Sequence, residues 1–504
     1  MMSATTRLSF TFTRPGADFN TPKPEGEPMR ILILGDFSGQ GADPKKLEER
    51  SILRVDIDNF DAVMARIAPR LRLRLDAEVD LAFRQIEDFH PDALFQNLEL
   101  FRGLARIRER LYDAATFPQA AEELRSLVQV APEAPAPDTG RTTDEDDQTT
   151  FERLLGGSSD RPEASPEARA KSIVENTLER IVAQYIVPDA PPFQDVYLKA
   201  VDEALSAKMR ELLHHPEFQA LEAAWRALWS LVSHLETGES LSLHVLDAGK
   251  AQLYDAVSAA GENLSGSGLY RLLVEQNTGG FGGEPWSLVI GNFSFGNSPE
   301  DVALLAACGL LAARAGGPFI AAADAGLLGC STLAESPGPQ DWAGMTPEAA
   351  KRWEALRQSP AAPWLGLALP RILLRLPYGR DADPIESFAF EEAEPPFAHA
   401  AFLWGNPAFY CALLLGRSYL ENGDSMQPGD HLQIDDLPAY SLKQDGDARL
   451  LPCAEVCLND RAIDKVLGLG IMPFLSHRSA NIARLARFQA LADPPSALRG
   501  FWSA

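Results

Sequence analysis

Short apolar runs alternate with helix-like stretches over the second half of the chain, and this alternation limits the possible folds more than any other feature. LSLHVL, SLVIGNF, PFIAAA and RILLRLPYG have the length and apolar character of buried strands. The stretches near 250–260 and 301–313 have the pattern of helices. Strands that alternate with helices are typical of α/β layers with a largely parallel sheet. We therefore expect an α/β fold with mixed sheets flanked by helices.

A second region of mixed strand and helix patterns lies between residues 30 and 130. RILILG, which starts at Arg30, is a short apolar run followed by turn residues, so it predicts a core strand and a turn. RLRLRL at 70–75 and the alternating residues near 79–83 predict a half-buried hairpin. Residues 94–111 place apolar side chains three or four apart, which predicts one amphipathic helix of about five turns. These side chains are Leu94, Leu98, Phe101, Leu104, Ile107 and Leu111.

Composition divides the chain in two. Residues 131–166 are rich in Pro, Ser, Thr and acidic residues, which predicts a mostly disordered acidic linker. We expect a first segment at 1–130, a linker at 131–169 and a second segment at 170–504. Two helical stripes separated at Pro216 predict a helical hairpin near 195–235.

The charge balance excludes some classes of partner. The 504 residues include 71 Asp and Glu against 46 Lys and Arg, a net charge of −25, which argues against electrostatic binding to nucleic acid or anionic membranes. The amino terminus has no signal-peptide pattern, and the apolar run at 301–313 is shorter than the roughly 20 residues that span a membrane. Five irregularly spaced cysteines are typical of reduced thiols. We expect a cytoplasmic protein.

Motifs for catalysis or cofactor binding are incomplete. The turn in RILILGDFSGQG lacks the third Gly and the Lys that nucleotide-binding loops require. His214 and His215 are adjacent, so on a helix they do not share a metal as an i, i+4 pair would. Cys453 and Cys457 have no second ligand pair at a suitable spacing, and no G-x-S-x-G motif occurs. We expect no catalytic residue, no cofactor and no metal site.

Several blocks resemble the two sheath subunits of bacterial type VI secretion systems. LILGDFSG, DIDNFDAVMARIAPRLRLRL and VDLAFRQIEDFHPDALFQNLELFRGLARIRERL resemble the small subunit, TssB or VipA, over most of residues 30–111. AVDEALSAKMRELLHHPEFQALEAAWRALWSLV, IGNFSFGNSPEDVALLAACGLLAARAGGPFIAAADAGLLG, LPRILLRLPYG, FLWGNPAFYCALLL and LNDRAIDKVLGLGIMPFLSH resemble the large subunit, TssC or VipB, over most of residues 170–480.

This resemblance implies a structural role without chemistry. Subunits of that family form small–large pairs that stack into a helical tube around an inner tube of Hcp rings. Contraction drives the inner tube outward, and an AAA+ unfoldase, ClpV, recycles the contracted sheath. The implied partners are other sheath or baseplate proteins, the Hcp tube and a ClpV-type unfoldase, in a homo- or hetero-oligomer. The apolar stripe at 94–111 then joins the two segments, within one chain or between chains.

Two departures from the family leave alternatives open. The family usually encodes the two parts as separate chains, and its large subunit normally continues past the region resembling GIMPFLSHRSANIARL. We therefore expect a TssB-like segment fused to a TssC-like segment that lacks the usual C-terminal region. Such a chain is a fused sheath subunit, a noncontractile cap, adaptor or baseplate-proximal protein, or an α/β enzyme of unknown reaction.

TFERLLGG at 150–157 is a local contact site that the resemblance suggests. In the family a short helix near the start of the large subunit is recognised by the unfoldase. Phe151, Leu154 and Leu155 have the spacing of a helix that docks in a groove. The alternative, which the composition of the surrounding linker favours, is a transient helix inside a disordered linker.

Overall fold

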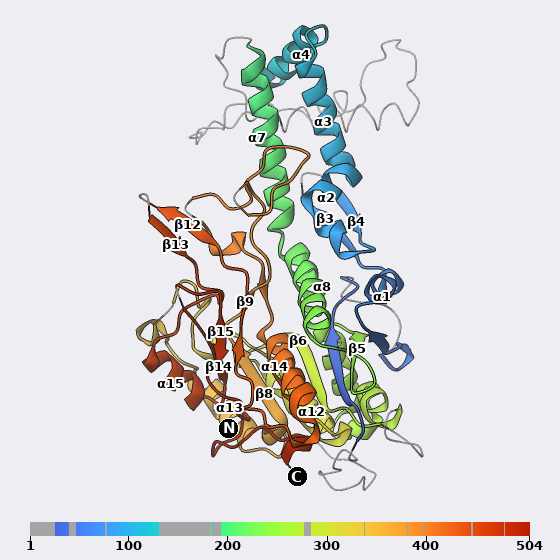
Figure 1. The fold of residues 1–504 in the computed structure, drawn as a ribbon, viewed down its shortest axis with the longest axis vertical. Helices are drawn as coiled ribbons and strands as arrows, with labels where there is room; N and C mark the ends of the chain where they lie inside the picture. The colour runs from blue at the N-terminus through green and yellow to red at the C-terminus, as the bar shows by residue number, and fades with distance from the viewer. Residues whose placement is uncertain are drawn as a thin grey trace, which may run out of the picture. The chain divides into compact units, whose positions relative to one another are not determined.

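The chain forms two compact units, shown in Figure 1. A computed structural model describes residues 26–39, 47–75, 78–130, 182, 193–276, 284–336, 338–380, 382–395, 397–444, 447–477 and 479–503. We name the larger unit the sheet unit; it falls within Met1–His90, Leu212–Pro384 and Phe390–Ala504. The smaller, helical unit falls within Pro91–Glu211 and Ile385–Ala389. Both units therefore contain residues of the first and the second segment.

A nine-stranded sheet forms the centre of the sheet unit, in the order β11-β15-β14-β8-β7-β6-β1-β5-β2. The six strands from β14 to β5 run parallel, and β2, β15 and β11 run antiparallel to their neighbours at the two sides. The bounds are β1 (Met29–Gly35), β2 (Leu53–Val55), β5 (Leu241–Asp247), β6 (Leu288–Phe295), β7 (Phe319–Ala323), β8 (Leu365–Leu369), β11 (Gln433–Ile434), β14 (Met472–Ser476) and β15 (Ala483–Leu485). The predicted α/β fold with a mixed sheet is confirmed.

Helices pack on the sheet, which explains why its central strands are apolar on both faces. Leu32 and Leu34 of β1 belong to a core shared with α9 and α12, whereas α14 contacts β1, β6, β7 and β8. The helices of this unit are α1 (Phe60–Ile67), α8 (Pro216–His234), α9 (Lys250–Ala260), α10 (Gly268–Tyr270), α12 (Pro299–Ala315), α13 (Pro347–Arg357), α14 (Pro407–Asn422) and α15 (Asp460–Gly468).

The helix predicted at 301–313 is confirmed as the buried helix α12. Its bounds follow from local chemistry, because the Ser298 side chain accepts a hydrogen bond from the Asp301 N–H and Pro299 opens the first turn. Gly316 ends the helix with φ 110°, a left-handed conformation that favours glycine. Nearly all side chains between these ends are buried, including Leu305 and Leu311 at 0% exposure.

Three two-stranded sheets accompany the large one. The predicted hairpin is confirmed by β3 (Arg70–Arg74) and β4 (Glu78–Ala82), which pair antiparallel. Leu71 and Leu73 are buried and the intervening arginines are exposed, as the alternating pattern predicts. The other pairs join β9 (Ile372–Leu373) to β10 (Trp404–Gly405) and β12 (Ser441–Gln444) to β13 (Asp447–Leu450).

The helical unit contains α2 (Pro91–Asn97), α3 (Glu99–Tyr112), α4 (Phe117–Val130) and most of α7 (Gln194–Leu213). The prediction of a single helix over 94–111 is wrong in one respect, because the apolar stripe lies on two helices that are separated at Leu98. Leu98 has an extended backbone, with φ −91° and ψ 131°, after Asn97, a weak helix former.

The predicted helix break near Pro216 is confirmed between α7 and α8. The His215 ring accepts a hydrogen bond from the Glu217 N–H, and Pro216 occupies the first turn of α8. Most of α7 lies in the helical unit, and α8 lies in the sheet unit, where it contacts α14. The predicted hairpin arrangement of these two helices stays a prediction. No helix among the described residues is both long and apolar enough to cross a membrane.

Candidate functional site

The first segment provides a central strand of the sheet. β1 pairs in parallel with β5 on one side, from Met29 opposite Leu241 to Gly35 opposite Asp247. On its other side it pairs in parallel with β6. All four residues from Ile31 to Leu34 are fully buried. Because β5 and β6 belong to the second segment, the two segments share one sheet and one core.

The GDFSG turn after β1 binds a carboxylate of the second segment. The N–H groups of Phe37 and Ser38 donate to the same Oδ1 atom of Asp247, at 2.8 and 2.9 Å. Gly39 has φ +70°, which favours glycine, and its N–H donates to Asp36 at 2.8 Å. The turn therefore uses its backbone donors within the chain, which agrees with the missing phosphate-loop residues. Burial raises the pKa of Asp247 above its usual value, although the hydrogen bonds from Ser38 and Phe37 oppose this shift.

An aromatic cluster fixes the same turn from α8. The buried Trp225 indole N–H donates to the Phe37 carbonyl at 2.9 Å, and the two rings lie 5.3 Å apart in an edge-to-face arrangement. Phe60 of α1 packs against Trp225 at 5.7 Å and against Trp229 at 4.9 Å. Aromatic pairs of this kind add about 0.5 to 1.5 kcal/mol beyond their buried area.

A buried ionic cluster lies nearby in the sheet unit. The Arg375 guanidinium lies between the carboxylates of Glu222 and Glu392, with nitrogen–oxygen distances of 2.7 to 3.2 Å. Arg226 pairs with Glu222 at 2.6 Å and donates to the Tyr378 hydroxyl at 2.8 Å. Burial alone would raise the pKa of Glu392, but the Arg375 charge and several hydrogen bonds lower it to about 2. The Glu392 carboxylate is thus held charged in the interior.

The first segment reaches this cluster through an aromatic contact. His90, which follows η2 (Ile86–Phe89), packs edge-to-face on the Tyr378 ring at 4.9 Å. The other face of the cluster is close to the end of α7, where His214 lies 3.6 Å from Glu392. Charged groups of the second segment and a ring of the first therefore form one packed site.

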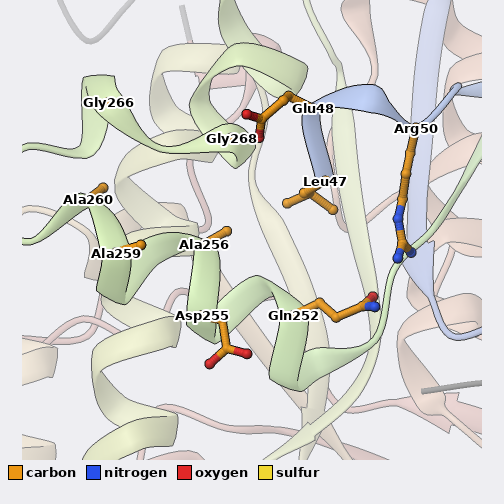
Figure 2. A pocket seen from close by; sticks show the side chains of 10 residues that line it. All are labelled: Leu47, Glu48, Arg50, Gln252, Asp255, Ala256, Ala259, Ala260, Gly266 and Gly268. Atoms are coloured by element: carbon orange, nitrogen blue, oxygen red, sulfur yellow. The ribbon is translucent and has the colours of Figure 1, made fainter. Parts of the chain in front are cut away.

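Figure 2 shows the side chains that line a cleft on the boundary between the segments, about 350 Å³ in volume. η1 (Leu47–Glu49) of the first segment forms one wall, and alanines of α9 form the other. Glu48 pairs with Arg271 at 3.2 Å, and the Arg50 guanidinium donates to the Asp247 carbonyl. The charged side chains beside the cleft therefore join the segments, and we assign the cleft no ligand.

A second cavity, of about 430 Å³, lies at the carboxyl ends of β6, β7 and β8, where α/β enzymes commonly bind substrates. Its buried acid, Glu455, is paired with Arg371 at 2.7 Å and lies 3.1 Å from His399. Burial would raise the pKa of Glu455, but these two partners lower it to about 2. Such mutual pairing suits a structural ion pair. Within the described part of the chain, no group of three or more His, Cys, Asp and Glu side chains is arranged to hold a metal ion.

In the helical unit, α3 of the first segment contacts α7 of the second. Arg108 pairs with Asp202 at 2.6 Å, and the Gln194 side chain donates to the carbonyl oxygens of Leu111 and Tyr112 at 2.9 and 2.6 Å. The six apolar residues named in the sequence analysis are all between 0 and 8% exposed. These residues are Leu94, Leu98, Phe101, Leu104, Ile107 and Leu111.

Sequence reasoning missed the residues that hold the GDFSG turn and the ionic cluster. Asp247, Trp225 and Arg375 are single residues without a motif, and one aspartate among 71 acidic residues is inconspicuous. The signal that was available is the turn itself, because backbone N–H groups that fold into the interior need an acceptor. Phe151, Leu154 and Leu155, together with the predicted linker at 131–169, lie outside the described residues.

Comparisons with known proteins match two parts of the chain. A family model described as VipB, tail sheath N-terminal domain, matches residues 195–491, and one described as type VI secretion system VipA matches residues 21–135. The type VI secretion system sheath protein TssC1 of Pseudomonas aeruginosa is 32% identical over 367 residues, which covers 70% of this chain and 73% of that protein. The sheath protein TssB1 of the same organism is 24% identical over 118 residues, which covers 22% of this chain and 69% of that protein. The chain therefore belongs to the type VI secretion sheath proteins, as a structural component in which a TssB-like segment is fused to a TssC-like segment.

Proposed function

We propose that a single chain acts as a complete sheath protomer, in which the two segments pair with each other rather than with separate chains. The position of β1 carries this proposal. A strand that lies between β5 and β6 has both backbone edges paired, so removing it would leave two open edges in the middle of a buried sheet. The family's two-chain pair is then replaced by a fold that does not dissociate.

The helical unit supports the same pairing. We propose that the apolar stripe of α2 and α3 packs against α7, whose Tyr197, Val201 and Leu205 are 0 to 1% exposed. Phe117 at the start of α4 packs edge-to-face on Tyr197 at 5.9 Å. In this proposal the functional division runs between residues 1–130 and 170–504, joined by a linker at 131–169, although each compact unit contains both segments.

A protease site inserted after Gly140 tests pairing within one chain. After cleavage, we expect both fragments to remain together through gel filtration without denaturant, at a ratio of one to one. The uncut chain is the control. Separation of the fragments under these conditions would contradict the proposal. To detect exchange between chains, labelled and unlabelled cleaved protein are mixed, and native mass spectrometry then reports whether fragments have been exchanged.

For assembly, we propose that the protomer joins other sheath or baseplate proteins through strand and helix contacts in the cytoplasm, around an Hcp-type inner tube. The relatives are structural sheath proteins, which supports an assembly role over an enzymatic one. Electron microscopy of the chain, alone and co-expressed with its genomic neighbours, tests this. Tubes with the chain along their length would support a sheath protomer. Label confined to tube ends would support the alternative of a noncontractile cap or adaptor, and small-molecule turnover by a monomer would contradict both.

We also propose, from the family resemblance alone, that Phe151, Leu154 and Leu155 contact a ClpV-type unfoldase. The test is a pull-down with the unfoldase's N-domain. Binding by wild type and loss of binding by Leu154→Asp and Leu155→Asp would support the contact, and equal binding by all three would leave the transient-helix interpretation.

A further inference from the structure

A histidine lies inside the part of the sheet where the two segments meet. β5, from the second segment, is flanked by β1 on one side and by β2 on the other, and both of these strands belong to the first segment. In this register His244 of β5 lies opposite Leu32 of β1 and opposite Arg54 of β2. Because paired residues of neighbouring strands project from the same face of a sheet, the His244 and Arg54 side chains share one face.

A second arginine of the first segment is fixed close to this histidine. Arg30 of β1 pairs with Glu284 at 3.3 Å, and its side chain is only 12% exposed. Its guanidinium lies 4.2 Å from the centre of the buried Trp286 ring. The His244 ring packs edge-to-face on the same indole at 5.1 Å. One tryptophan therefore contacts both the histidine and a guanidinium that an ion pair holds in place.

The charges around the His244 ring are unfavourable for a proton on it. The charged groups that act on the ring are Arg30 and Arg54, and both are positive. Glu284 and Glu27 act on the Arg30 guanidinium. Burial, together with the two arginines, lowers the pKa of His244 from 6.5 to about 4. The ring is therefore neutral in the folded protein at neutral pH, with the Ser242 hydroxyl 3.1 Å from its Nε2 atom.

The stability of the sheet unit should depend on pH through this ring. In the unfolded chain the pKa of a histidine is about 6.5, whereas the folded protein resists protonation of His244 down to about pH 4. The stability that neutral His244 contributes is therefore fully present above pH 6.5 and is lost as the pH falls from 6.5 to 4. The pKa values of Glu392 and Glu455 are lowered from 4.5 to about 2, so what these acids contribute is lost at lower pH.

We propose that His244 makes the contact between the two segments acid-sensitive, because a proton on its ring adds a third positive charge beside Arg30 and Arg54 and repels the strands of the first segment from β5. Like charges on opposite residues of neighbouring strands are destabilising. We expect β2 to separate first, since it is three residues long and pairs with β5 alone among the described strands. The proposal concerns strands of one sheet and does not depend on the assembly role proposed above.

An NMR titration of the full chain tests the charge state of the ring. The histidines are labelled with ¹³C at Cε1, and the His244 signal is the one that His244→Gln removes. At pH 5.5 an ordinary histidine is about nine-tenths protonated, and we expect His244 to be still neutral. Arg54→Gln removes the charge opposite the ring and should move this titration to higher pH. A His244 signal that titrates near pH 6.5 in the wild-type chain would overturn the proposal.

Urea unfolding at pH 7.5 and pH 5, at low salt, tests the effect on stability. From pH 7.5 to 5 the folding equilibrium constant of the wild-type chain should fall roughly 30-fold more than that of His244→Gln. His234→Gln is the matched control, because His234 is an exposed histidine of the same unit, and this variant should behave as wild type does. An equal fall in wild type and His244→Gln would contradict the proposal.

Arg54→Gln provides a second test of stability, which holds even if His244→Gln does not fold. Arg54 is exposed, so the change leaves the buried core intact. With one positive charge fewer beside His244, the folding equilibrium constant should fall less between pH 7.5 and pH 5 than it does in wild type. A fall as large as that of the wild-type chain would show that repulsion by the first segment is not the cause.

Discussion

The two segments meet in different ways in the two units. In the sheet unit the join is made of backbone pairing around β1 and of side chains with 0% exposure, such as Ile33. In the helical unit the polar part of the join is made by the Arg108–Asp202 pair, whose side chains are 45% and 36% exposed. Exposed ion pairs are worth about 0 to 1 kcal/mol and weaken with salt, whereas the loss of a buried side chain costs several times more. The buried sheet contacts should therefore contribute more to holding the segments together than the exposed polar contacts of the helical unit.

The ionic cluster gives the largest expected effect on the sheet side. Arg375→Met removes the guanidinium between Glu222 and Glu392 and leaves two buried carboxylates without their main partner, so we expect a loss of about 3 to 5 kcal/mol in unfolding free energy. Urea unfolding followed by tryptophan fluorescence measures this unit selectively, because all eight tryptophans belong to it. Arg380→Met is the control, since Arg380 is exposed and should change stability by less than about 0.5 kcal/mol. If Arg375→Met lowered the unfolding free energy no more than Arg380→Met does, the cluster would not be needed for the stability of this unit.

The second-largest loss of stability is expected from a change in strand β1. Ile33→Ala in β1 opens a cavity in the shared core and should cost about 2 to 4 kcal/mol by the same measurement. Ile57→Ala is the matched control, because Ile57 is 55% exposed and belongs to the same segment. If the Ile33 variant loses no more stability than the Ile57 variant, the strand is not a structural link between the segments.

The turn after β1 should contribute less to the unfolding free energy than the strand does. Asp247→Ala removes the acceptor for the Phe37 and Ser38 N–H groups, for which we expect a cost of about 2 kcal/mol. Asp255→Ala on α9 removes an exposed carboxylate from the neighbouring helix and should be almost neutral. Hydrogen exchange at residues 35–39 should rise in the first variant alone, and unchanged exchange there would rule out Asp247 as the anchor of the turn.

The smallest effect is expected in the helical unit. A double-mutant cycle of Arg108→Ala and Asp202→Ala should give a coupling energy of about 0.5 kcal/mol at low salt, and less at 0.5 M NaCl. Hydrogen exchange of α3 and α7 peptides measures the stability of each variant, from which the coupling energy is calculated. Tryptophan fluorescence is not suitable here, since this unit contains no tryptophan. Arg106→Ala provides the comparison, because Arg106 pairs with Glu99 of its own helix. A coupling energy as large as the Ile33 effect would remove the contrast between the two joins.

Much of the local structure was predictable from the sequence, because burial and periodicity are local properties. Ile31 to Leu34 read as a core strand, and the alternating arginines and leucines of β3 read as a half-buried hairpin. The pairing partner of β1 was not predictable, since an apolar run indicates burial without indicating which strands lie beside it. The break at Leu98 was missed because the apolar spacing continues across it. Asp247 and Arg375 were missed because their roles depend on contacts far apart in sequence.

The location of β1 also sets an order of events during synthesis. β1 begins at Met29, whereas its neighbours in the sheet begin at Leu241 and Leu288. At about 5 to 20 residues per second, the ribosome delivers these neighbours on the order of ten seconds or more after β1 itself. During that interval the apolar segment Met29–Gly35 has been synthesised without the two strands that pair with it in the finished sheet. Between the synthesis of β1 and that of its neighbours there is thus a delay, during which a chaperone or a transient local partner would protect this apolar segment from aggregation.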